Sequence, residues 1–217
     1  MGDLEVSNLL IVESHNDKYF IEALIDFMNL SNINVSEPLC SIDEYECIGG
    51  IGNLKKKLKE VKARVAKNGD IKKIGIIVDA DNKGIEERGI EIENLISTVF
   101  SEDDEIEFLY YITNVEGFGE LETVLKEIKK NDSIYADCLN AWQECLPEDK
   151  KIKKKDFDKF WVQIYQRYDC CSKKEAKQTD KKCNNEVSLK EKDIWNFEHE
   201  ILNNLKEFLI NLSKDNR

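Results

Sequence analysis

Four segments of the chain are apolar enough to form buried strands, and a helical pattern or a turn signal follows each of them. These segments are NLLIVE (8–13), YECIGG (45–50), KKIGIIVDAD (72–81) and EIEFLYYIT (105–113). Unbroken apolar runs rich in β-branched residues are typical of strands that are covered on both faces, and alternation of strands with helices indicates a parallel sheet. The pattern therefore predicts an α/β fold with a four-stranded parallel sheet flanked by helices.

Helical spacing of apolar residues predicts three helices among these strands and four more after the last strand. Asn16 is the expected N-cap of the first helix. The others are expected near 52–67, 85–100, 120–128, 133–145, 157–168 and 195–212. We therefore expect an α/β core over residues 1–130 and a helical extension over 131–217 that packs on it as one globular domain, with a mobile lysine-rich loop at about 169–188.

The numbers of cysteines and histidines indicate the cellular compartment and the residues available for acid–base catalysis. The 217 residues are enough to bury a core without a disulfide framework or a metal, and the seven cysteines are an odd number without zinc-knuckle spacing. No apolar run approaches the ~18 residues of a membrane span, and the first residues lack a signal-peptide pattern. We therefore expect a cytoplasmic protein without membrane contact. The chain has only two histidines, so acid–base chemistry is expected to fall to carboxylates or lysines.

Charge is segregated along the chain, although the net charge is −12. Residues 55–73 carry nine lysines and arginines, and residues 86–107 carry nine acidic residues. A basic surface that guides a nucleic acid is therefore compatible with the acidic total, and a solvated helix surface is the alternative for these lysines. The candidate nucleic-acid contacts are Lys55, Lys56, Lys59, Lys173, Lys174, Lys181 and Lys182.

Acidic residues follow the predicted strands at the place where an open parallel sheet binds ligands, outside the carboxyl ends of the strands. Glu13 closes the first strand, and Asp79 and Asp81 close the third. In an extended chain these two aspartates would point the same way, about 7 Å apart. Gly49-Gly50 closes the second strand and lets the backbone approach closely. The same edge is expected to receive Asp17, Glu116, Glu120 and Glu122.

A cluster of carboxylates at one edge needs a cation. Two carboxylates about 4 Å apart repel each other by roughly 4 kcal/mol at an effective dielectric constant near 20. Oxygen ligands without histidine favour Mg²⁺ or Mn²⁺. The candidate metal ligands are Asp79, Asp81, Asp17 and Glu122. Helix capping is the alternative for Asp17 and Glu120, because each lies near the start of a predicted helix.

Two segments resemble a known domain. LLIVESHNDKYF, in which an acid closes the first strand, and IIVDADNKG, in which paired aspartates close the third, resemble the Toprim domain of topoisomerases, bacterial primases and overcoming-lysogenization-defect nucleases. The resemblance is sharper to small stand-alone Toprim-like proteins of unknown function, which also have GG after the second strand, G-x-LE after the fourth and a closing W…LKEFL helix. It covers nearly the whole chain and implies a Toprim, Rossmann-like fold.

The resemblance implies a nuclease that uses a metal ion to hydrolyse phosphodiester bonds in DNA or RNA. By analogy, Glu13 would serve as general acid/base or metal ligand, and Asp79 and Asp81 would hold Mg²⁺. A topoisomerase also needs a tyrosine from another domain, and a primase needs a zinc module and a template-binding region, neither of which fits in 217 residues. Ser14 stands where the family has glycine, so a side chain occupies the turn that a phosphate would approach.

Two other classes of function stay open. A non-catalytic Toprim-fold protein would bind a metal or a partner without turnover, which the acidic total and Ser14 favour. A phosphoaspartate phosphatase or receiver-like protein would use Asp79 as nucleophile or phosphoacceptor, although Lys83 stands where the phosphatase motif has threonine. The sequence also leaves open a homodimer or a partner protein that presents the substrate.

Overall fold

A four-stranded, all-parallel sheet forms the centre of the protein, as the sequence predicts. The computed structural model describes residues 8–43, 46–48, 50–69, 71–102, 104–172, 174, 177, 183 and 185–214. The strands are β1 (Asn8–Val12), β2 (Ile33–Val35), β5 (Lys73–Asp79) and β6 (Glu107–Thr113), in the order β2-β1-β5-β6. β5 pairs with β1 on one side and with β6 on the other, so it is an interior strand, and its carboxyl end lies between those of β1 and β6. The fold is α/β and Rossmann-like.

The second predicted strand does not belong to this sheet, so that prediction is wrong. Glu46–Ile48 form β4, which pairs antiparallel with β3 (Ser41–Asp43) in a separate hairpin. The strand beside β1 is β2, which has only three residues and one neighbour. Because an edge strand is covered less completely, its I-N-V sequence carries no apolar run and gives little signal. Tyr45 and Gly49 lie outside the described residues.

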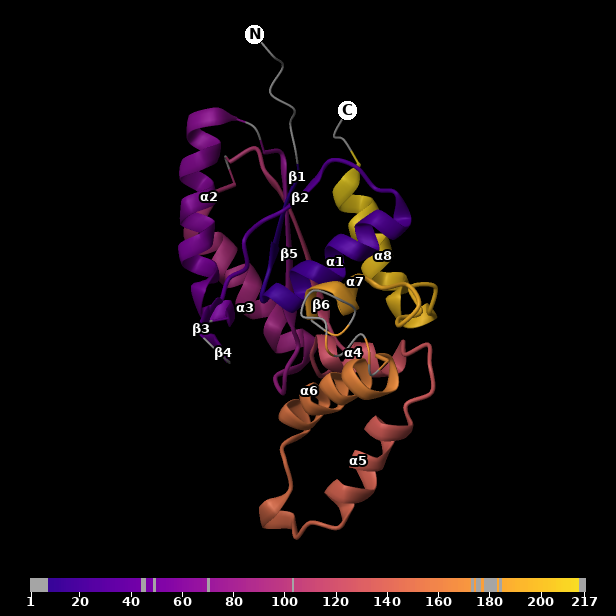
Figure 1. Ribbon diagram of the computed structural model, residues 1–217. Helices are drawn as coiled ribbons and strands as arrows, with labels where there is room; N and C mark the ends of the chain where they lie inside the picture. The colour runs from indigo at the N-terminus through magenta and orange to yellow at the C-terminus, as the bar shows by residue number, and fades with distance from the viewer. Residues whose placement is uncertain are drawn as a thin grey trace.

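Helices cover both faces of the sheet. They are α1 (His15–Met28), α2 (Leu54–Asn68), α3 (Gly84–Val99) and α8 (Asn203–Ser213). Leu9 and Ile11 of β1 belong to the apolar cluster formed with α2 and α3, and Leu10 and Val12 belong to the cluster formed with α1 and α8. Figure 1 shows these two pairs of helices on opposite sides of the sheet. Burial on both faces explains why β1 is apolar without alternation.

The chain after β6 is helical. Its helices before α8 are α4 (Leu121–Glu127), α5 (Ile134–Glu144), α6 (Lys154–Ile164), which continues into a π-helical turn at Tyr165–Asp169, and α7 (Asn185–Lys190). α6 packs against α4 near the end of the sheet where the strands finish, while α5 projects outward (Figure 1). Every helix in the described part of the chain is too short or too polar to cross a membrane.

The last predicted helix and the predicted loop differ in detail from the structure. The helix expected over 195–212 begins at Asn203, and Trp195 instead forms an isolated bridge with Lys129 while its Nε1 donates to the carbonyl oxygen of Ser188 at 2.8 Å. In the loop, a disulfide that the cysteine pattern did not predict joins Cys171 and Cys183.

Gly75 of β5 marks a close approach of α8 to the sheet. A Cβ atom at this position would lie 2.6 Å from Leu212 Cδ2 and 3.1 Å from Phe208 Cζ, both in α8. Gly75→Ala should therefore overpack the interface and lower the free energy of unfolding by about 1–3 kcal/mol, as measured by urea denaturation. Gly52→Ala is the control, because nothing lies within 4 Å of a Cβ atom there. Equal stability of the two variants would contradict the packing of α8 on β5.

Candidate functional site

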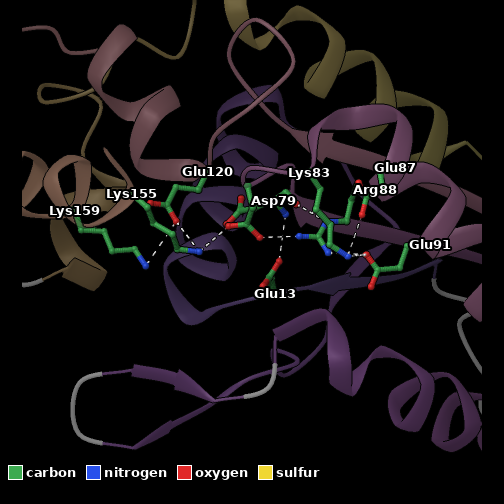
Figure 2. Close-up of polar contacts among 10 residues, drawn as sticks. Glu13, Asp79, Lys83, Glu87, Arg88, Glu91, Glu120, Lys155 and Lys159 are labelled. Carbon is green, nitrogen blue, oxygen red and sulfur yellow. Dashed lines mark hydrogen bonds and ion pairs between the residues drawn. The ribbon is translucent and has the colours of Figure 1, made fainter. Parts of the chain in front are cut away.

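Five carboxylates from distant parts of the chain line one cavity at the carboxyl edge of the sheet. They are Glu13 after β1, Asp17 in the first turn of α1, Asp79 at the end of β5, and Glu120 and Glu122 at the start of α4. The cavity has a volume of about 350 Å³, and Lys155 and Lys159 of α6 also line it. Figure 2 shows Asp79 between Lys155 and Lys159 of α6 on one side and Arg88 of α3 on the other. Four of the five acidic residues predicted for the site, all but Asp81, thus meet in this cavity.

Glu13 and the end of β5 are in direct contact. The Oε2 atom of Glu13 accepts a hydrogen bond from the backbone N–H of Asp79 at 3.2 Å. Gly50 lies against the same side chain, since a Cβ atom there would be 2.5 Å from Glu13 Oε1. This is the close backbone approach expected of the glycine pair, while Gly49 lies outside the described residues. Burial raises the pKa of Glu13, and the hydrogen bond from Asp79 opposes this effect.

Asp79 has a buried oxygen with free hydrogen-bonding capacity. Its Oδ1 atom is enclosed and has no hydrogen-bond partner among the described residues. Burial raises the pKa of Asp79 well above its usual value, and the neighbouring carboxylates Asp17, Glu13, Glu122 and Glu120 raise it further. The free energy of ionising this group is therefore unusually high unless a cation is close.

Asp81 does not share the environment of Asp79, which corrects the prediction that the two aspartates point the same way. β5 ends at Asp79, and Asp81 has a φ of 50°, in the left-handed region. One oxygen of Asp81 accepts from Arg88 at 2.7 Å and the other from Lys155 at 2.6 Å. Arg88 is 4% exposed and also donates to the carbonyl oxygen of Asp79 at 2.9 Å. The extended-chain argument fails because the turn into α3 begins at once.

Asp17 takes part in the capping of α1, the alternative that its position left open. The N-cap is Ser14 and not Asn16: the Ser14 hydroxyl accepts from the Asp17 N–H, and the Ser14 N–H donates to Asp17 Oδ2 at 2.8 Å. The Ser14 hydroxyl also lies 2.6 Å from Asp17 Oδ2. Burial raises the pKa of Asp17 to about 7, although the bond with Ser14 lowers it. Ser14 is therefore part of the helix start in this protein.

Glu120 has an environment like that of Asp79, with lysines added. The residue is 2% exposed, and its Oε2 atom lies 3.3 Å from Lys155 Nζ and 3.6 Å from Lys159 Nζ. Its Oε1 atom is buried without a hydrogen-bond partner in the described part of the chain. Burial raises the pKa of Glu120 to about 7, and Glu122 adds to this. Glu122 accepts from the Asn16 side chain at 3.3 Å.

The basic residues at the site are not those that the sequence analysis selected. Lys55, Lys56 and Lys59 are exposed on α2 and do not line the acidic cavity, and Lys174 is exposed in the disulfide loop. Lys173, Lys181 and Lys182 lie outside the described residues. Lys155 and Lys159 were missed because they lie in a helix more than thirty residues after Glu120, and no local pattern links them to the acids.

The fit of a cation can be judged from the free oxygens. The described residues contain no group of three or more His, Cys, Asp or Glu side chains arranged to hold a metal ion. Asp81 is unsuitable as it stands, because Arg88 and Lys155 occupy its oxygens. Asp79 Oδ1 and Glu120 Oε1 have free capacity and are carboxylate oxygens, the donor type that Mg²⁺ and Mn²⁺ prefer. These two oxygens are therefore the candidate cation ligands of the cavity.

Glu120 should make the stability of the protein depend on pH. Its pKa rises from an ordinary 4.5 to about 7 on folding, so the folded state binds a proton more tightly than the unfolded state does. The free energy of unfolding should therefore fall as the pH rises from about 4.5 to 7. In Glu120→Gln the fall should be smaller by on the order of 2 kcal/mol, at about 1.4 kcal/mol per pKa unit, when urea denaturation is followed between pH 5 and 8. Glu127→Gln, an exposed residue of the same helix, should behave like wild type.

Asp81 should contribute to stability through its cationic partners. Asp81→Asn leaves the buried Arg88 guanidinium without its carboxylate at 2.7 Å and should lower the free energy of unfolding by about 1–3 kcal/mol. Glu87→Gln is a matched control on α3, since Glu87 is an exposed partner of Lys83 at 3.6 Å and exposed pairs contribute little. A variant Asp81→Asn as stable as Glu87→Gln in thermal and urea unfolding would show that Arg88 does not depend on Asp81.

Comparison with known proteins identifies a family. The family described as "Protein of unknown function (DUF3226)" matches residues 7–214, a range that includes every residue of the acidic cavity. No curated protein and no solved structure matches the chain. The chain therefore belongs to the DUF3226 family.

Proposed function

We propose that the protein is a nuclease that hydrolyses phosphodiester bonds of DNA or RNA with the help of Mg²⁺ or Mn²⁺. The observation that carries this proposal is the pair of buried carboxylate oxygens, Asp79 Oδ1 and Glu120 Oε1, that have no hydrogen-bond partner among the described residues and line a cavity with three more carboxylates. A buried polar atom without a partner costs about 1–3 kcal/mol, and a cation bound to both oxygens would remove this cost. The resemblance of the segments around Glu13 and Asp79 to the Toprim domain supports the same function.

The residues of the cavity divide into two roles. Asp79 and Glu120 would hold the cation, which when bound supplies an oriented water and neutralises charge on the scissile phosphate. Glu13 would move the proton, because burial raises its pKa toward the range in which a carboxyl group acts as general acid or base near neutral pH. Its hydrogen bond to the Asp79 N–H keeps it at the end of β5.

Lys155 and Lys159 would bind the phosphate. They are the cationic side chains of α6 that line the acidic cavity, and both are partly exposed. A phosphodiester that approaches a protein of net charge −12 needs local positive charge, and hydrogen bonds between ammonium groups and phosphate oxygens are among the stronger ones. These two lysines are better placed for this role than those of α2.

A non-catalytic role in metal or partner binding is the second candidate function. It is supported by Asp81, whose two oxygens are both held by cationic side chains, so that the second aspartate of the D-x-D segment is not free. Ser14 supports it too, because its side chain fills the turn where the Toprim family has glycine. The two candidates differ in turnover, and the metal-binding form of the second shares the cation with the first.

Cation binding should be visible as a rise in melting temperature. Mg²⁺ or Mn²⁺ binds the native state and relieves the repulsion among the acids, so both should stabilise the wild type in a thermal-shift titration. Asp79→Asn should abolish the rise, and Glu127→Gln should retain it. Equal shifts in wild type and Asp79→Asn would place the cation elsewhere and contradict the proposed site.

Turnover separates the two candidate functions. Fluorescently labelled single-stranded and duplex DNA and RNA should be cleaved by the wild type with Mn²⁺ or Mg²⁺ and not with EDTA. Glu13→Gln should lose cleavage by at least about a hundredfold, the usual size of a general acid–base contribution, and keep the metal-dependent thermal shift. A thermal shift without cleavage of any of these substrates would favour the non-catalytic function.

A further inference from the structure

A second cavity adjoins the acidic one and, unlike it, has the exposed ring of Phe118 in its lining. Its volume is about 250 Å³, and Glu120 and Lys155 line both cavities. Val115 and Phe118, in the turn after β6, form its apolar part. Its polar lining consists of Asn82, Thr123, the lysines Lys154 and Lys155, and the carboxylates Asp81, Glu116, Glu120 and Asp158. A volume below the ~300–1,000 Å³ of drug-sized sites suits a ligand with a single ring system.

Phe118 is held at this cavity by the backbone and remains accessible. The Val115 and Phe118 residues exchange two backbone hydrogen bonds, of 2.8 Å and 3.2 Å, which close the turn. Gly84 lies beside the ring: a Cβ atom there would be 3.0 Å from Phe118 Cε1. Phe118 is nevertheless 56% exposed. An aromatic ring that is carried on a hydrogen-bonded turn and has an open surface suits a stacking ligand.

We propose that this second cavity binds an unpaired nucleobase, stacked on Phe118, while the phosphate of the same nucleotide lies at Lys155 between the two cavities. The inference rests on the proposed function and names its substrate more closely. Lys155 contributes positive charge where the two cavities meet, and Asn82 offers an amide donor and acceptor to the edge of the base. Glu120 also lines both cavities, so a nucleotide in the second cavity lies next to the acidic one.

A base site of this kind accepts unpaired bases and excludes bases inside a duplex. A base inside a duplex is stacked on both faces and presents only its edges, so it cannot place a face on Phe118. The substrate is therefore single-stranded, or an end or loop in which one base is free. Base-face stacking is tolerant of sequence, so any preference among bases would come from the edge contacts with Asn82.

Binding of AMP without metal tests the base site separately from hydrolysis. AMP and ribose 5-phosphate are titrated in EDTA and followed by amide NMR shifts. AMP should bind at least about fivefold more tightly than ribose 5-phosphate, because stacking of a base on an aromatic ring contributes at least the free energy that this ratio of affinities requires. AMP should also shift the amide resonances of Asn82 and Gly119. Phe118→Ala should reduce the affinity for AMP to that for ribose 5-phosphate. Tyr168→Ala removes a ring that is 55% exposed and lies outside both cavities, and should leave AMP binding unchanged.

Phe118→Leu controls for a folding defect, because leucine keeps an apolar contact with Gly84 but has no ring. Its melting temperature should stay close to that of the wild type, and its affinity for AMP should nevertheless fall. Equal affinities of the wild type for AMP and ribose 5-phosphate would overturn the proposal. So would binding of N-acetyltryptophanamide as tight as that of AMP, which would indicate the aromatic side chain of a protein partner. If Phe118-dependent AMP binding holds while cleavage and the metal-dependent thermal shift are both absent, the base site stands and the nuclease function fails.

Discussion

The turn between β5 and α3 depends on one buried guanidinium. Arg88 donates to the carbonyl oxygen of Asp79, to the carboxylate of Asp81 and to that of Glu91, at 2.7–2.9 Å. A buried cation with several donors is stable only when carboxylates and carbonyls receive them. Together with the two backbone hydrogen bonds between Asp81 and Gly119, these bonds hold Asp81 in its left-handed conformation. Arg88 and Lys155 pair with Asp81, so Asp79 is the only member of the aspartate pair that lines the acidic cavity. Its carboxylate therefore adds to those of Glu13, Asp17, Glu120 and Glu122 there.

A second anchor brings the C-terminal half of the chain to the same edge. Asp158 of α6 is 1% exposed and accepts from Lys126 at 2.6 Å and from Thr123 at 3.1 Å, both in α4. Because this contact fixes α6 on α4, the lysines on the neighbouring face of α6 reach Glu120 and Asp81. The acids therefore come mainly from the ends of strands and the start of α4, and their nearest lysines come from a helix that packs beside them.

The sequence predicted those features that depend on local pattern. The α/β class, the parallel sheet and the gathering of Glu13, Asp79 and Glu122 follow from apolar runs and from the acids that close them. β2 was not predicted because a three-residue edge strand needs few apolar residues. The conformation of Asp81 was not predicted because it depends on contacts with Arg88 and Gly119, which lie farther along the chain. Lys155 lies 74 residues after Asp81, so their contact is a product of tertiary packing that no spacing rule contains.

The position of Lys155 makes α6 and the acidic edge a linked system. Its ammonium group is the shared counter-ion of Asp81 and Glu120, at 2.6 Å and 3.3 Å. Any ligand that competes with Lys155 for these carboxylates weakens the attachment of α6 to the end of the sheet. By reciprocity, any partner that draws α6 away increases the affinity of the acids for that ligand by the same factor. The helix that completes the site is therefore also the means by which a distant binding event can tune it.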